Sequence, residues 1–140
     1  MKYLLDTNIC IYIIKRKPEN VIKHFKNYKP GDIAISSITT AELNYGIVKS
    51  SKPDLNTIAL KEFLQPLIIL DYNEKDSEKY GRIRYELEKK GLPIGAMDLL
   101  IASQALSRDL ILVTNNESEF KRIKGIRTEN WVKLEKKDTR

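Results

Sequence analysis

The chain has 140 residues, of which 41% are hydrophobic and 31% charged, a composition typical of a single soluble globular domain. One cysteine and one histidine exclude an intrachain disulfide and a cysteine zinc cage, and they argue against Ser-His-Asp or Cys-His chemistry. No apolar run reaches the ~18 residues needed to span a bilayer, so we expect a cytoplasmic protein, and the net charge of +6 favours a polyanionic partner such as nucleic acid.

The first half of the chain alternates short apolar segments with stretches of helical periodicity. The first apolar segment ends at Asp6, and isoleucines follow it near helical spacing. Pro18 suits the first turn of a second helix. Thr39 and Glu42 have the spacing of a capping box. The elements predicted in this half are a strand at 2–6, helices at 7–15 and 18–27, a strand at 33–36, and helices at 39–50 and 56–65.

The second half continues the same alternation. Its first strand is fully apolar, and the long amphipathic helix that follows is stopped by Gly91. A Pro-Ile-Gly turn precedes the next helix. The elements predicted here are a strand at 67–70, helices at 73–90 and 96–107, a strand at 110–114, a short helix at 117–123 and an edge strand at 126–131.

Apolar strands that alternate with helices indicate an α/β fold with a mostly parallel central sheet covered by helices on both faces. We therefore predict a three-layer α/β/α architecture with four to five strands. Residues 1–135 are expected to form one domain, and the charged residues 136–140 a solvated tail. Ligands of such sheets bind beyond the carboxyl ends of the strands, so the residues just after each strand are the first candidates for a site.

Four oxygen-bearing side chains occupy such positions. Asp6 ends the first strand, Glu42 lies near the start of the helix after the second strand, Asp98 lies in the first turn of the helix before the fourth strand, and Asn116 follows that strand. Each acid also has a purely structural interpretation, as a helix cap or a partner of a helix dipole. Together they predict a hard-oxygen site for Mg²⁺ or Mn²⁺, because clustered acids repel unless a cation neutralises them.

Four segments in a fixed order carry a family resemblance. They are Leu-Leu-Asp-Thr-Asn at 4–8, Ser-Ser-Ile-Thr-Thr-Ala-Glu-Leu-Asn-Tyr-Gly at 36–46, Pro-Ile-Gly-Ala-Met-Asp-Leu-Leu-Ile-Ala at 93–102 and Val-Thr-Asn-Asn-Glu-Ser-Glu-Phe at 113–120. No single segment is very specific, but the ordered set resembles the acidic motifs of PIN-domain ribonucleases across nearly the whole chain. The resemblance is closest to the VapC toxins of VapBC type II toxin–antitoxin modules.

The resemblance implies a PIN-like fold and a Mg²⁺- or Mn²⁺-dependent endoribonuclease. Asp6, Glu42 and Asp98 match the family's metal-binding acids, and Asn116 matches a fourth position that is often Asp. This departure weakens the case for a second metal, although Glu119, one helical turn further on, offers a substitute. Two further side chains are assigned supporting roles: Thr114 would position a water or the scissile phosphate, and Asn8 would hold an acid in place by hydrogen bonding.

The expected reaction is hydrolysis of an RNA phosphodiester by a metal-activated water, with a carboxylate helping to take the proton. The resemblance implies a toxin that inhibits translation, with tRNA, and initiator tRNA in particular, as the candidate substrate. It also implies a VapB antitoxin that blocks the site, and a toxin homodimer.

Two surfaces are candidates for binding these partners. Basic side chains follow the fourth motif closely enough to carry RNA phosphates to the site, although a solvated charged face would look the same. Leu43, Ile47 and the apolar positions of 56–65 are candidates for a groove that binds a partner helix, with core packing as the simpler alternative. The basic candidates are Lys121, Arg122, Lys124 and Arg127.

Three other functions remain as alternatives. A receiver-like phosphoacceptor domain would use Asp71, Asp6 and Thr114, but it lacks a second acid beside Asp6 and leaves Glu42 and Asp98 without a role. A haloacid-dehalogenase-type phosphatase needs Asp-x-Asp, and the chain has Asp-Thr-Asn at this place. The third alternative is a non-catalytic RNA-binding module, because Asn116 stands where the family often has Asp.

Overall fold

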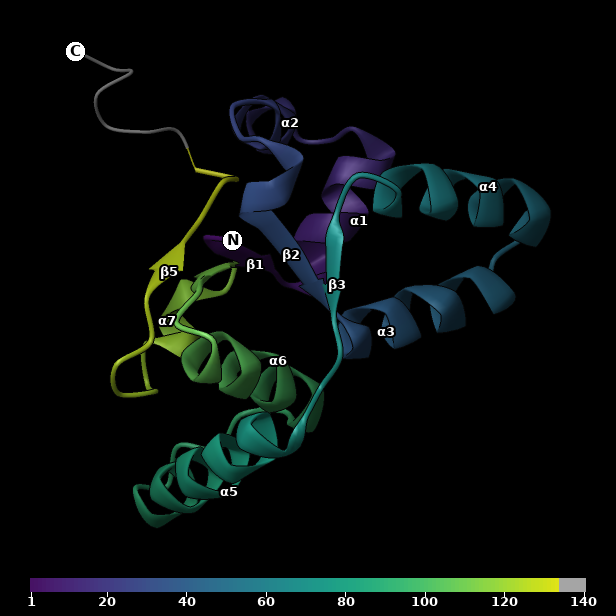
Figure 1. Ribbon diagram of the computed structural model, residues 1–140. Coiled ribbons are helices and arrows are strands. Elements are labelled where there is room, and N and C mark those ends of the chain that lie inside the picture. Colours follow the sequence, from purple (N-terminus) through teal and green to yellow (C-terminus); the bar gives the residue numbers. More distant parts are fainter. Residues whose placement is uncertain (134–140) are drawn as a thin grey trace.

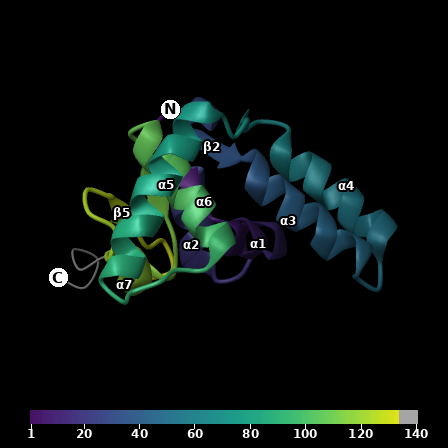
Figure 2. The ribbon, with the colours of Figure 1, turned by 90° about the horizontal axis from the view of Figure 1, so that it is seen from below.

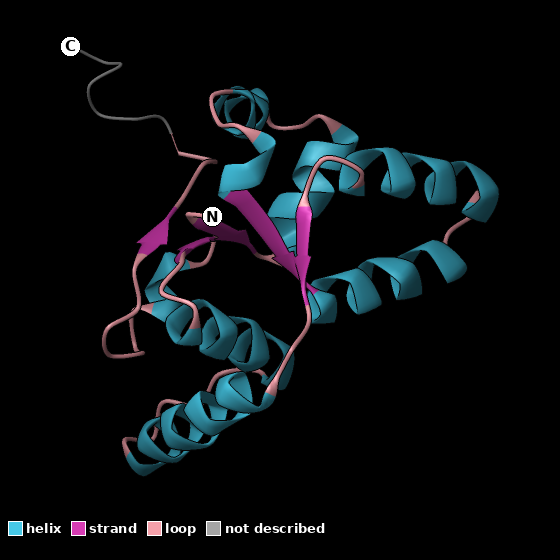
Figure 3. Cartoon of the chain, viewed as in Figure 1, coloured by secondary structure: helices cyan, strands magenta, loops and turns pink. Residues whose placement is uncertain are grey.

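A computed structural model describes residues 1–133, and the tail predicted at 136–140 lies outside the described residues. Its centre is a five-stranded sheet in the order β3-β2-β1-β4-β5, in which every pairing is parallel. Figure 3 shows these strands enclosed by helices. The strands are β1 (Tyr3–Leu5), β2 (Ile33–Ser36), β3 (Ile68–Leu70), β4 (Ile111–Val113) and β5 (Thr128–Glu129).

The three central strands are covered on both faces, which explains why they are apolar except for Ser36 at the end of β2. Leu4 of β1 pairs with Ala34 of β2 and with Leu112 of β4, and all three point into one of the two hydrophobic cores. Their sequence neighbours Leu5 and Val113 point into the other core, because successive side chains of a strand alternate between the faces.

Helices cover each face and complete the three layers (Figure 1). One face packs against α1 and α2 and against the inner sides of α3 and α4; the other packs against α5, α6 and α7. Helices α3 and α4 run side by side as a hairpin that projects from the rest of the molecule, as both Figure 1 and Figure 2 show. The helices are α1 (Thr7–Lys15), α2 (Glu19–Lys26), α3 (Ser37–Val48), α4 (Pro53–Leu64), α5 (Glu74–Lys89), α6 (Ala96–Ser107) and α7 (Glu117–Phe120), with a 3₁₀ turn at Pro30–Asp32.

The predicted α/β/α fold and its parallel sheet are confirmed, and α1, β2 and α6 have the predicted bounds. The predicted start of α3 is wrong. Ser36 already caps this helix, since its hydroxyl accepts a hydrogen bond from the Ile38 N–H at 3.0 Å. Thr39 therefore lies inside the first turn and forms no capping box. Likewise α4 begins at Pro53, which occupies a first-turn position, rather than at residue 56.

None of the helices within residues 1–133 is long and apolar enough to cross a membrane.

Candidate active site

Asp6 and Thr114 lie side by side because their strands are parallel neighbours. Leu5 of β1 is in register with Val113 of β4, and the Asp6 N–H donates to the Val113 carbonyl at 3.0 Å. The Thr114 hydroxyl hydrogen-bonds the Asp6 carboxylate and accepts the Asn116 N–H at 3.0 Å. Thr114 is fully buried, and its hydroxyl lies against Asp6, whose pKa it lowers; its predicted role in positioning a water or the scissile phosphate stays a prediction.

Asp6 is a buried acid with an unfavourable environment for its charge. Its side chain is 6% exposed, and Oδ1 caps α1 by accepting the Ile9 N–H at 3.0 Å. The pKa of Asp6 is raised to about 6, mainly by burial and also by the charges of Asp98 and Glu42, against the lowering effect of the Thr114 and Ile9 hydrogen bonds. The structural interpretation of Asp6 as a helix cap is therefore correct, but it does not account for the neighbouring acids.

Glu42 reaches this region from α3, the helix that follows β2. The side chain is half-buried, and its Oε1 accepts a hydrogen bond from the Thr7 hydroxyl at 2.5 Å. Thr7 is the residue directly after Asp6, so this bond links the first and second acidic segments. Sequence reasoning missed Thr7, although its hydroxyl next to Asp6 was the available signal.

Asp98 and Glu119 bring two further carboxylates. Burial raises the pKa of Asp98, and the charges of Glu119 and then Glu42 add to the effect. Glu119 lies on α7 and is half-buried. Its Oε2 accepts a hydrogen bond from the Asn116 side-chain amide at 2.9 Å. The charge of Glu119 thus acts on Asp98. The Asn116 side-chain amide is hydrogen-bonded to Glu119.

The donor set suits a hard divalent cation, since it consists of carboxylate oxygens and the buried Asp6 has no ion pair with a cation in the part of the chain that the structure describes. Among the described residues, however, no three His, Cys, Asp or Glu side chains stand close enough together to hold a metal ion. The acids therefore interact through their charges, and a bound cation would have to draw their oxygens closer.

The remaining candidates are placed less favourably. Asn8 is exposed and makes no hydrogen bond with any of the acids in the part of the chain that the structure describes. Arg127 is held at the amino-terminal end of β4, where its guanidinium bonds the Asp109 carboxylate at 3.0 Å. That is the opposite end of the strand from Thr114, so the structure does not bring Arg127 together with the acids, and its role in RNA binding stays a prediction.

Lys121, Arg122 and Lys124 are exposed around the end of α7. The Arg122 side chain is fixed by a hydrogen bond, because its guanidinium donates to the Pro93 carbonyl at 3.1 Å. Pro93 lies just before α6, the helix that carries Asp98. These positions place positive charge close in sequence to Glu119 and, for Arg122, against the segment that leads to Asp98.

An apolar groove of about 310 Å³ adjoins the acids between α1, α3 and α4. It contains Leu43 and Ile47, as expected for a groove that takes a partner helix, together with Leu60 from the 56–65 segment. Glu42 lines the same groove. A segment bound there would therefore lie beside one of the acids. The groove's main side chains are Ile11, Ile14, Glu42, Leu43, Ile47 and Leu60.

Fold and site together define an α/β protein in which Asp6, Glu42 and Asp98 interact through their charges beyond the carboxyl ends of a parallel sheet. The model of the PIN domain family matches residues 3–126. The chain is 49% identical over 132 residues to Ribonuclease VapC2 of Haemophilus influenzae, covering 94% of this chain and 99% of that one. It is 46% identical to the tRNA(fMet)-specific endonuclease VapC of Shigella flexneri, covering 94% and 98%.

The fold has solved counterparts as well. The crystal structure of DNA-bound VapBC from Salmonella typhimurium superimposes with a TM-score of 0.88 at 46% identity, covering 94% of this chain and 98% of that one. The chain belongs to the PIN-domain family and, within it, to the VapC ribonucleases.

Proposed function

We propose that the protein is the toxin of a type II toxin–antitoxin pair and acts as a divalent-metal-dependent endoribonuclease. The observation that carries the proposal is the environment of Asp6, a buried acid whose charged neighbours are two more acids, Asp98 and Glu42. Such an arrangement is unfavourable unless a cation joins it. Near-full-length similarity to ribonucleases supports the same conclusion.

Asp6, Glu42 and Asp98 would hold Mg²⁺ or Mn²⁺, and we assign Glu119 rather than Asn116 as the fourth acidic residue. Glu119 raises the pKa of Asp98 through its charge, whereas the Asn116 amide is hydrogen-bonded to Glu119. When bound, the ion supplies Lewis-acid activation for phosphodiester hydrolysis. Thr114 would keep Asp6 oriented toward the ion.

The substrate we propose is tRNA, with initiator tRNA as the first choice, because a relative at 46% identity is named for that specificity. Lys121 and Lys124 are exposed cations that would contact RNA phosphates near Glu119. A VapB antitoxin helix would occupy the groove between α1, α3 and α4 and cover Glu42. Homodimer formation is proposed on the family resemblance alone.

The receiver-like alternative is not supported. Asp71 follows β3, an edge strand of the sheet that is separated from β1 by β2. Its side chain is exposed, and its carbonyl is hydrogen-bonded by Gln104 and Arg108. Asp71 therefore has neither the central position nor the neighbouring acids that a phosphoacceptor site beside Asp6 would need.

The test is cleavage of total tRNA by the purified, antitoxin-free protein in Mg²⁺ or Mn²⁺. We expect discrete fragments that disappear in EDTA and in the Asp98→Asn variant, and end mapping then identifies the cut site. Asp98→Asn should keep the melting profile of the wild type, because the side chain is only half-buried. Undiminished cleavage by a well-folded Asp98→Asn variant would refute the assignment, and tight RNA binding without cleavage would favour the non-catalytic module.

A further inference from the structure

Behind Glu42 lies a pair of hydroxyls that the proposed reaction does not use. The Thr7 hydroxyl is 2.5 Å from Glu42 Oε1 and 3.3 Å from the Thr39 hydroxyl. Thr7 is the first residue of α1, and Thr39 lies in the first turn of α3 and is completely buried. The three side chains therefore form a short chain of hydrogen bonds between two helices.

Counting protons sets the direction of this chain. An ionised carboxylate only accepts hydrogen bonds, and a threonine hydroxyl has a single proton to donate. The Thr7 hydroxyl is the donor in both contacts, 2.5 Å from Glu42 Oε1 and 3.3 Å from the Thr39 hydroxyl oxygen. Because it has one proton, the much shorter contact takes that proton to Glu42, and the contact with Thr39 is the weaker one. The Thr7 hydroxyl is therefore directed at Glu42.

The consequence is a fixed carboxylate. A free glutamate side chain samples many rotamers, and ordering it opposes ligand binding. Here one oxygen, Oε1, is held by a residue covalently next to Asp6, while no hydrogen bond among the described residues engages Oε2. The Glu42 carboxylate is thereby held at a fixed position relative to Asp6, and its other oxygen can bind a ligand.

We propose that Thr7 is a positioning residue, which uses its hydroxyl to hold Glu42 ready for a divalent cation. The inference rests on the proposed metal site and deepens it. Partners that orient metal ligands contribute about ten- to a hundredfold to metal affinity, and we expect the lower end here because only one of several acids is held.

The experiment is calorimetric titration of the full chain with MnCl₂, with the melting temperature recorded for each variant. Thr7→Val removes the hydroxyl but keeps the shape and the β-branch, and Thr7→Ser restores a hydroxyl. The matched control is Thr40→Val, since Thr40 is a half-buried threonine of α3, the helix of Glu42, and its hydroxyl donates to the Ser37 carbonyl at 2.9 Å. If Thr7→Val does not fold, Thr7→Ala replaces it.

We expect Thr7→Val to bind Mn²⁺ about tenfold more weakly, with Thr7→Ser and Thr40→Val close to the wild type. Wild-type affinity in a folded Thr7→Val variant, failure of Thr7→Ser to restore affinity, or equal weakening by Thr40→Val would each overturn the role of Thr7 while leaving the metal site intact. Absence of Mn²⁺ binding by the wild type would instead overturn the proposed metal site, and the inference with it.

Discussion

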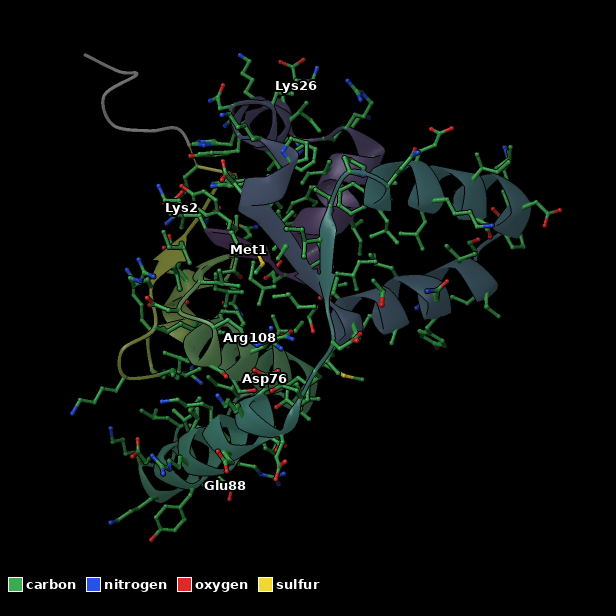
Figure 4. All side chains as sticks on the ribbon, in the orientation of Figure 1. Met1, Lys2, Lys26, Asp76, Glu88 and Arg108 are labelled. Atoms are coloured by element: carbon green, nitrogen blue, oxygen red, sulfur yellow. The ribbon has the colours of Figure 1, made fainter. Side chains whose placement is uncertain are left out.

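Within residues 1–133, two aspartates at the starts of helices are strongly buried, Asp76 of α5 and Asp6 before α1, and their surroundings are opposite. Asp76 is fully buried and forms a capping box with Asn73. It also bonds the guanidinium of Arg108 at 3.2 Å. Figure 4 shows Asp76 and Arg108 together between α5 and α6. Asp6 is buried almost as deeply, but the nearby charged groups are Asp98 and Glu42.

The contrast separates a structural acid from a functional one. Asp76 carries its own counter-ion and enough hydrogen bonds to make burial tolerable. Asp6 has hydrogen bonds but forms no ion pair with a cation within residues 1–133, so its burial remains unfavourable while it is charged. A buried acid that the protein leaves without a counter-ion is the expected feature of a site that receives its cation from solution. The following experiments test whether the two aspartates differ in this way.

The largest expected effect comes from removing the counter-ion of Asp76. Arg108→Leu leaves a buried, unpaired carboxylate, which costs about 3–5 kcal/mol of unfolding free energy, measured by urea denaturation. Arg84→Ala is the matched control, because it breaks an exposed pair with Glu88 on α5 and should change stability little. Equal losses in the two variants would mean that burial of the Asp76 pair is unimportant.

The second prediction is that the charge of Asp6, unlike that of Asp76, makes the folded protein less stable. Because the folded state raises the pKa of Asp6 from 3.8 to about 6, it binds the proton more tightly than the unfolded chain does. The unfolding free energy of the metal-free protein should therefore fall as the pH rises from about 4 to about 6, by up to about 3 kcal/mol.

Asp6→Asn should remove this loss and raise the melting temperature at about pH 8, since Asn caps a helix as well as Asp does. Melting curves between about pH 4 and pH 8 measure the effect. A variant that is less stable than the wild type at the upper end of this range would show that the Asp6 charge is already compensated.

Addition of a divalent cation should give a somewhat smaller stabilisation. At a hundred times its dissociation constant at about pH 8, Mn²⁺ should raise the unfolding free energy by about 2.7 kcal/mol. The same Mn²⁺ concentration should stabilise the protein less at about pH 5, where the proton on Asp6 weakens binding. The Asp6→Asn variant should lose most of this gain. Thermal melting with and without MnCl₂ checks both statements, and an equal shift in the variant would place the ion elsewhere.

The smallest effect concerns the exposed cations. Lys121→Ala should weaken RNA binding by about two- to threefold and reduce the slope of log affinity against log salt by about one. Arg127→Ala should not do so, because Arg127 is bound to Asp109 at the other end of β4. Filter binding at several salt concentrations compares them. Equal losses in the two variants would contradict the placement of the RNA near α7.

Much of this could be predicted from the sequence, because its signals are local. The apolar strands, the helix spacing and the ordered acidic motifs specified the α/β/α fold, the parallel sheet and the candidates Asp6, Glu42 and Asp98. Other features depended on contacts between segments. The sequence suggested a capping box for Thr39 and Glu42, whereas Ser36 caps α3.

What tertiary structure alone decided was which side chains meet. Arg127 is near Asn116 in sequence, but parallel pairing of β4 and β5 puts it at the opposite end of the strand. Thr7 and Glu42 are 35 residues apart, and only the packing of α1 beside α3 joins them. Sequence patterns report the local preferences of one segment, whereas the charge environment of Asp6 and the partner of Glu42 arise from side chains on other segments, which only the folded chain brings together.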